Sequence, residues 1–123
     1  MKIKNFKGVF SRNNLSKSPS KCGIINLDDS VGPGTHWVCY YDNYYFDSFG
    51  LPPPNEVINY IPGIKYNTIQ YQEKTSVLCG YYCLFFIKML QSGTTIYDLL
   101  YKILKPFNTK QNEQTVIKYF KEH

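Results

Sequence analysis

The sequence predicts one α+β domain, in which a small and mostly antiparallel sheet packs against a central helix. The chain has 123 residues, which is enough for a single hydrophobic core. Its first half contains short aromatic and β-branched runs separated by turn residues, whereas its second half contains longer helical patterns. Aromatic residues make up 17% of the chain, which favours a packed core over a disordered segment. Strands followed by helices are typical of an α+β domain, and we expect residues 1–123 to form a single one.

The N-terminal third contains one expected strand. Residues 1–21 are polar and turn-rich, and their one short apolar run is at residues 8–10. Residues 22–27 form a short apolar run that predicts a buried strand. Residues 28–34 contain Asp, Ser, Gly and Pro, a composition that predicts a loop.

The clearest local prediction is a β-hairpin. Residues 36–41 and 44–49 are aromatic and β-branched runs, and Asp42-Asn43 lies between them. Two such runs around two turn residues predict antiparallel strands joined by a tight turn. Beyond the hairpin, Pro53 or Pro54 can open a short helix through about residue 60. Residues 65–71 then alternate enough to predict another strand.

The longest helix is expected in the centre of the fold. Thr75 or Ser76 can cap it, and it extends to about Gln91. Its side chains are apolar almost all the way round, which is typical of a helix that is buried on every side.

Two shorter helices are expected after the central one. Thr95 and Asp98 have the spacing of a capping box for a helix through about Leu104, and Pro106 ends it. A last amphipathic helix is expected over residues 110–121.

Charge and cysteine content narrow the class of protein. The formal net charge of +5 fits either an acidic or nucleic-acid partner or a soluble surface with no specific partner. The four cysteines have neither Cys-x-x-Cys nor zinc-ligand spacing, so we expect free thiols and no metal. The first residues are polar and Lys-rich, and no apolar run reaches the length of a membrane helix. We therefore expect an intracellular chain that is neither secreted nor membrane-bound.

His36 is the candidate general base, because the other histidine is the last residue of the chain. A turn at Asp42-Asn43 places Asp47 opposite Val38, on the same face of the hairpin as His36. Asp47 is then the diagonal neighbour of His36, within reach of its side chain. A carboxylate there can orient the imidazole and leave its second nitrogen free to take a proton. The alternatives are a core histidine and an aspartate that only stabilises the turn.

Cys79 is the candidate nucleophile, because it falls in the first turn of the central helix. Unpaired amides and the helix dipole stabilise a thiolate there, and the thiolate is the reactive form. Gly80 follows and would let a substrate backbone approach closely. The other three cysteines are expected to be structural and buried: Cys22, Cys39 and Cys83.

Gln72 begins the loop that leads to Cys79, and a side-chain amide there could donate to a developing oxyanion. From the residues alone, it cannot be distinguished from Gln70 or Glu73.

The candidate residues lie in motifs that resemble a known group of proteases. The adenovirus maturation protease and its relatives, which include the SUMO-specific proteases, carry His, Asp or Glu, Gln and Cys in this chain order. The seven-position gap between Gln72 and Cys79 and the Cys-Gly-x-x-Cys run also match the adenovirus type. The wider pattern resembles the short maturation proteases of virophages and Polinton-type elements. The motifs are Asn5-Phe6-x-Gly8-Val9-Phe10-Ser11-Arg12, Cys22-Gly23-Ile24-Ile25-Asn26-Leu27-Asp28, Gly32-Pro33-Gly34-Thr35-His36-Trp37, Tyr45-Phe46-Asp47-Ser48-Phe49-Gly50 and Cys79-Gly80-Tyr81-Tyr82-Cys83.

The resemblance implies a papain-like cysteine protease fold and an activity. Capsid or other virion precursors would be cleaved at glycine-containing sites. Gln72 and the backbone amide of Cys79 would form the oxyanion hole. Gly34, Trp37 and Gly80 would flank a narrow substrate cleft, although Trp37 fits a core position equally well.

The resemblance also bears on partners and location. It implies a monomer that requires no cofactor and acts in the virion and in the host cytoplasm or nucleus. DNA, bound without sequence preference, or an activating peptide remain open as activators. Two alternatives remain as well: a protease that removes a ubiquitin-like modifier, and an inactive DNA-binding or structural virion component with the same fold.

Overall fold

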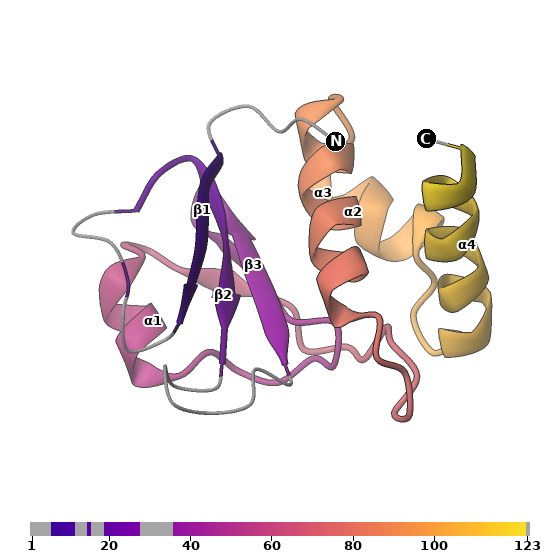
Figure 1. Cartoon of the computed structure of the whole chain (residues 1–123), viewed down its shortest axis with the longest axis horizontal. Coiled ribbons are helices and arrows are strands. Elements are labelled where there is room, and N and C mark those ends of the chain that lie inside the picture. The colour runs from indigo at the N-terminus through magenta and orange to yellow at the C-terminus, as the bar shows by residue number, and fades with distance from the viewer. Residues whose placement is uncertain (1–5, 12–14, 16–18, 28–35, 123) are drawn as a thin grey trace.

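The computed structural model describes residues 6–11, 15, 19–27 and 36–122. The loop predicted over residues 28–34, which includes Gly34, lies outside this part of the chain. The described elements form layers, with a short helix on one side of a sheet and the longer helices on the other (Figure 1). This arrangement is the predicted α+β class.

The sheet has five strands in chain order, and it is mixed rather than mostly antiparallel. The pairs β1–β2 and β4–β5 are parallel, whereas β2–β3 and β3–β4 are antiparallel. The prediction was wrong at the two outer pairs, because long connections rather than hairpins join their strands. The strands are β1 (Phe6–Ser11), β2 (Cys22–Asn26), β3 (Trp37–Tyr41), β4 (Tyr44–Phe46) and β5 (Lys65–Tyr66).

Two strands differ from their predictions. β1 lies in the stretch predicted to be polar and turn-rich, where its short apolar run is a weak indicator of a strand. β5 ends at Tyr66, although a strand was predicted through residue 71. Beyond Tyr66, the side chain of Asn67 rather than its main chain hydrogen-bonds to the backbone of Asp47, so the strand pairing stops there.

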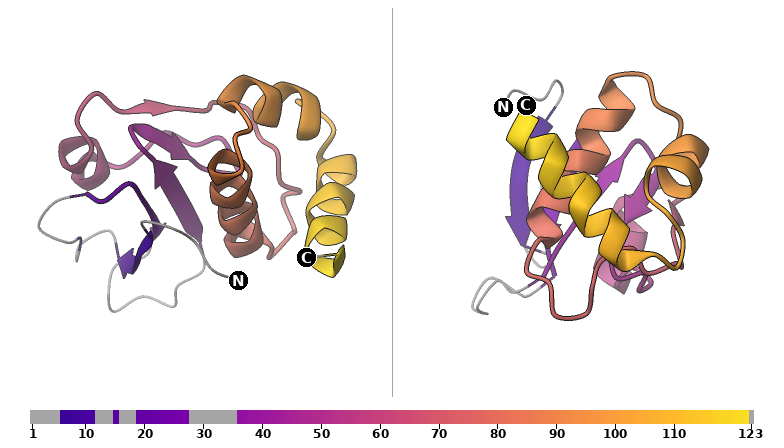
Figure 2. Two further views of the ribbon diagram at one scale, coloured as in Figure 1. Left: turned by 90° about the horizontal axis from the view of Figure 1, so that it is seen from above. Right: turned by 90° about the vertical axis from the view of Figure 1, so that its right-hand side faces the viewer.

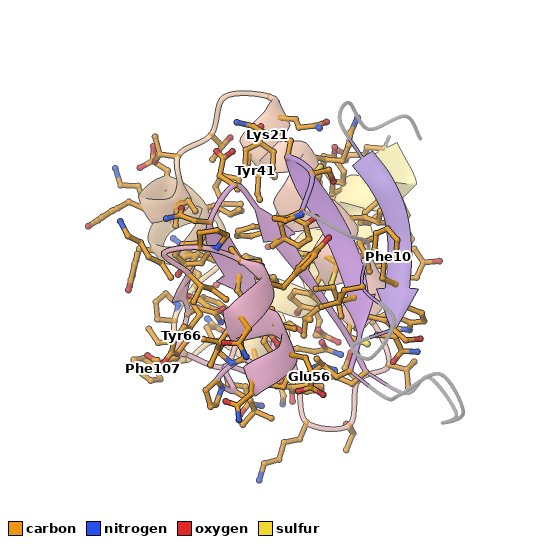
Figure 3. The ribbon with its side chains drawn as sticks, turned by 90° about the vertical axis from the view of Figure 1, so that its left-hand side faces the viewer. Phe10, Lys21, Tyr41, Glu56, Tyr66 and Phe107 are labelled. Carbon is orange, nitrogen blue, oxygen red and sulfur yellow. The ribbon has the colours of Figure 1, made fainter. Side chains whose placement is uncertain are left out.

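The hairpin register is as predicted. Cys39 pairs with Phe46, and Tyr41 pairs with Tyr44. Asp42 adopts a positive φ of 53° in the turn, a conformation that aspartate tolerates better than most residues. Lys21 and Tyr41 lie together at this end of the sheet in Figure 3, where Lys21 Nζ is 2.7 Å from Asp42 Oδ1 and 5.2 Å from the Tyr41 ring centroid.

The helices follow the predicted order, with shifted boundaries. α1 (Asn55–Tyr60) begins after Pro54, as predicted. α2 (Cys79–Gln91) begins two residues after the start that a Ser76 cap predicts, because Ser76 Oγ accepts hydrogen bonds within the preceding loop instead of capping the helix. α4 (Thr109–Glu122) lies across α2 (Figure 2), and their aromatic rings pack edge to face.

The third predicted helix changes type along its length. Thr95 Oγ1 accepts from Asp98 N at 3.1 Å, as a cap should, and α3 (Ile96–Asp98) follows. The chain then continues as a π-helical segment, η1 (Leu99–Ile103), in which Leu104 N donates to Leu99 O.

The two faces of the sheet pack on different helices. Phe46 stacks on Phe86 of α2, with ring centroids 4.6 Å apart. On the other face, Tyr40 and Tyr45 pack with Val57 of α1. α2 is therefore central, as predicted. Among the described residues, no helix combines the length and apolarity needed to cross a membrane.

Candidate active site

The base and the carboxylate lie at the open end of the hairpin. His36 directly precedes β3, and Asp47 directly follows β4. Because the register matches the prediction, the two side chains meet, and His36 Nε2 lies 2.9 Å from Asp47 Oδ1. The Asp47 side chain is fully buried and that of His36 is 17% exposed.

The carboxylate of Asp47 is held by the chain that follows it. Phe49 N donates to Asp47 Oδ1 at 2.8 Å, and Gly50 N donates to Asp47 O at 2.8 Å. The Phe49 ring also packs against the imidazole of His36, with centroids 4.9 Å apart. The turn after β4 therefore fixes the carboxylate and one face of the imidazole together.

Asn67 was missed in the sequence, although its side chain contacts Asp47. Asn67 Oδ1 accepts from Asp47 N at 3.0 Å, and Asn67 Nδ2 donates to Asp47 O at 2.7 Å. The sequence shows only that an asparagine directly follows a short strand. No local sequence pattern indicates which backbone groups its side chain contacts.

The second nitrogen of His36 is placed for proton transfer. His36 Nδ1 is buried and has no hydrogen-bond partner among the described residues. Burial lowers the pKa of His36, but its interactions with the Asp47 and Cys79 side chains outweigh burial and raise the pKa to about 9. The imidazole is therefore favoured in its protonated form near neutral pH.

Cys79 is the first residue of α2 and is buried. Burial raises the pKa of its thiol, but interaction with His36 and the backbone amides of Trp37 and Gly80 outweighs this effect, so the pKa is lowered. The amide contributions are those expected at a helix N-terminus and the adjoining strand. Each member of the pair thus favours the charged form of the other.

The other three cysteines lack such an environment. Burial raises the pKa of Cys22 to about 11 and raises that of Cys83 further above its ordinary value. Cys39 Sγ donates to Cys83 O at 3.7 Å, and all four thiols are free. The prediction that these three are buried is confirmed.

Gln72 is fully buried and firmly bonded. Its Oε1 accepts from Ser48 Oγ at 2.5 Å, and its Nε2 donates to Ser76 O at 3.0 Å and to Ser76 Oγ at 3.1 Å. To serve an oxyanion, one N–H of this amide must exchange Ser76 for the substrate. The predicted role of Gln72 stays a prediction.

The structure describes two of the three residues that were expected to flank the substrate cleft, Trp37 and Gly80. The Trp37 ring is half-buried and packs against the larger core cluster, while its backbone amide acts on Cys79. A Cβ added at Gly80 would meet no described atom within 4 Å. Gly34 lies outside the described residues.

Taken together, His36, Asp47 and Cys79 have the contacts and the directions of pKa shift that a thiolate–imidazolium pair with an orienting carboxylate requires. Such a pair supplies a nucleophile and then a proton donor, which is the chemistry of acyl transfer by thiol hydrolases. No protein-family model matches the chain.

The chain is a distant homologue of a viral cysteine protease. Cysteine protease S273R of African swine fever virus is 29% identical over 86 aligned positions, which cover 53% of this chain and 32% of that protein. The chain therefore spans about a third of the length of the curated relative that it matches.

Solved structures of the African swine fever virus pS273R protease share the fold. One matches with a TM-score of 0.56 and 22% identity, covering 82% of this chain and 43% of that one. A second matches with a TM-score of 0.53 and 20% identity, covering 77% and 41%.

Proposed function

We propose that this chain is a cysteine endopeptidase in which Cys79 is the nucleophile, His36 the acid–base group and Asp47 the residue that orients the base. The observation that carries the proposal is the His36–Asp47 contact of 2.9 Å, which commits Nε2 and leaves a buried Nδ1 for Cys79. The lowered pKa of Cys79 and the homology to a viral cysteine protease support it.

The reaction follows from these positions. The thiolate of Cys79 attacks the carbonyl carbon, and the carbonyl oxygen becomes an oxyanion. The backbone amide of Cys79 and one N–H of Gln72 stabilise that charge. His36 donates its proton to the leaving amine, which produces a thioester. His36 then takes a proton from water, whose oxygen attacks the thioester carbonyl. The C–S bond breaks, the carboxylic acid product leaves, and the thiolate–imidazolium pair is restored.

The proposed substrates are capsid or other virion precursor proteins, cleaved at glycine-containing sites. The open space beside Gly80 supports close passage of a substrate backbone along the first turn of α2. We place the enzyme among the short maturation proteases of virophages and Polinton-type viruses, acting as a monomer in the infected cell and the virion. DNA or a peptide is proposed as an optional activator.

The activity is tested with Cys79→Ala against precursors and peptides that contain Gly-Gly and Gly-x-Gly. The parent should cleave them and Cys79→Ala should not. Cys83→Ala is the matched control, since it makes the same change one turn further into α2, and it should retain cleavage. Equal cleavage by the parent and Cys79→Ala would refute the proposal. Cleavage of a ubiquitin-like fusion in preference to the precursors would favour the deconjugating alternative.

The activated pair is tested without a substrate. Iodoacetamide alkylation of each cysteine is followed by mass spectrometry from about pH 5 to 9, in the parent and in His36→Ala. We expect Cys79 to react fastest in the parent and to lose that advantage without His36. If Cys79 reacts no faster than Cys83, with or without added DNA, the chain is the inactive alternative.

A further inference from the structure

The side chain of Asn67 takes the place of a strand beside Asp47. β4 and β5 pair in parallel as far as Tyr45 and Tyr66, and β5 ends there. At the next position, Asn67 presents its side-chain amide to the main chain of Asp47. The N–H of Asp47 donates to Oδ1 at 3.0 Å, and the carbonyl of Asp47 accepts from Nδ2 at 2.7 Å.

Only an amide of this length can make both bonds. The acceptor must face a backbone N–H and the donor must face a backbone carbonyl, and asparagine carries one of each on a single plane. Asn67 is only 5% exposed, so water would not readily replace these bonds. A second donation from Nδ2 to Ile69 O at 3.2 Å fixes the plane of the amide.

The position of the Asp47 main chain sets the direction of the Asp47 carboxylate. Asp47 Oδ1 accepts from both His36 Nε2 and Phe49 N, whereas Oδ2 has no partner among the described residues. The alignment of the carboxylate therefore rests on one oxygen and on the backbone behind it. Rotation of that backbone would break the contact with His36 without unfolding the hairpin.

We infer that Asn67 is a positioning residue, which aims Asp47 at His36 by hydrogen bonding to both main-chain polar groups of Asp47. This inference rests on the proposed function, since it assigns Asn67 to the same site. Within the described part of the chain, the Asn67 side chain hydrogen-bonds to Asp47 and Ile69 and not to His36 or Cys79, so its effect on the reaction passes through Asp47.

The chain contains a matched control in Asn112. Its Oδ1 accepts from Lys105 N at 2.6 Å, and its Nδ2 donates to Lys105 O at 2.9 Å and to Tyr71 O at 3.1 Å. It is fully buried and makes the same kind of two-sided bond to one backbone residue, but it does not contact Asp47. Loss of either asparagine removes three comparable hydrogen bonds.

The experiment compares Asn67→Ala with Asn112→Ala in the full chain. Urea unfolding measures stability, NMR titration measures the pKa of His36, and alkylation below pH 7 measures the reactivity of Cys79. Both variants should be less stable. Only Asn67→Ala should shift the pKa of His36 from about 9 toward the ordinary value of 6.5 and slow Cys79 alkylation tenfold or more.

An unchanged His36 pKa and alkylation rate in folded Asn67→Ala would overturn the inference, as would equal shifts in both variants. If Asn67→Ala does not fold, Asn67→Gln keeps the amide but displaces it by one methylene group, and it should show the same shifts at smaller size. If the parent itself has a His36 pKa near its ordinary value and an unreactive Cys79, the proposed function is wrong. That result differs from the ones that overturn only the role of Asn67.

Discussion

His36 and Asp47 flank one hairpin, whereas Gln72 and Cys79 are the two ends of a loop that leads into α2. The first pair is set by strand register, and few residues separate its members in the chain. The second pair depends on contacts from distant parts of the chain. The geometry of the first pair, the hairpin half of the site, is thus set by a short stretch of sequence, whereas that of the second pair, the loop half, is set by tertiary contacts.

The loop half is braced by α4. Thr109 Oγ1 donates to Glu73 Oε1 at 2.6 Å, and Asn112 Nδ2 donates to Tyr71 O at 3.1 Å. Tyr82 of α2 donates to Glu113 of α4 and so ties the helix that bears the nucleophile to the same brace. α4 therefore holds the residues on either side of Gln72.

Ser48 joins the two halves. Its carbonyl accepts from Tyr71 N at 2.8 Å and from Gln72 N at 3.0 Å, and its hydroxyl bonds to the Gln72 side chain. Because Ser48 directly follows Asp47, one peptide unit connects Asp47 to the residue that holds Gln72, the proposed oxyanion donor. The comparison predicts that activation of the Cys79 thiol needs the hairpin half but not Gln72, whereas hydrolysis needs both.

Gln72→Ala should give the largest difference between the rate of hydrolysis and the rate of Cys79 alkylation. Loss of one oxyanion donor lowers the turnover rate by about 10²–10³-fold. Alkylation of Cys79 by iodoacetamide forms no oxyanion, so its rate should stay within about threefold of the parent. Peptide hydrolysis and alkylation, measured on the same sample, test this split. Gln70→Ala is the control and should retain hydrolysis. An equal fall in both rates would place Gln72 in the thiol-activating half.

The same division explains which features were predictable from sequence. Asp42-Asn43 marks the turn of the hairpin, and alternation then places Asp47 against His36 without any other knowledge of the fold. The start of α2 was placed too early, because Ser76 looks like a helix cap but is occupied by Gln72 and Leu78. Asn67 could not be identified, since its partner is 20 residues away.

The pH dependence should also separate hydrolysis from alkylation. The thiolate of Cys79 forms as pH rises through its lowered pKa, so both rates should rise on the acid side. His36 loses its proton as pH rises through about 9, and it can then no longer donate to the leaving amine. Hydrolysis should therefore fall by about tenfold per pH unit beyond that point, whereas alkylation should level off. A parallel fall in alkylation would contradict the assignment of His36 as the acid.

Replacing two glycines by alanine, one in each half of the site, should give the smallest effects, and the two changes in stability should have opposite signs. Gly50 has a φ of 76°, and a Cβ there would lie 2.7 Å from the backbone carbon of Ile69. Gly50→Ala should destabilise the protein by about 1–3 kcal/mol, as judged by urea unfolding. Gly80→Ala meets no described atom and lies in a helix, where alanine is favoured, so stability should be unchanged or higher by up to about 1 kcal/mol. Because the added methyl would face the passing substrate, the same variant should raise KM for glycine-containing peptides. Full activity in Gly80→Ala would show that the substrate backbone does not run beside the first turn of α2.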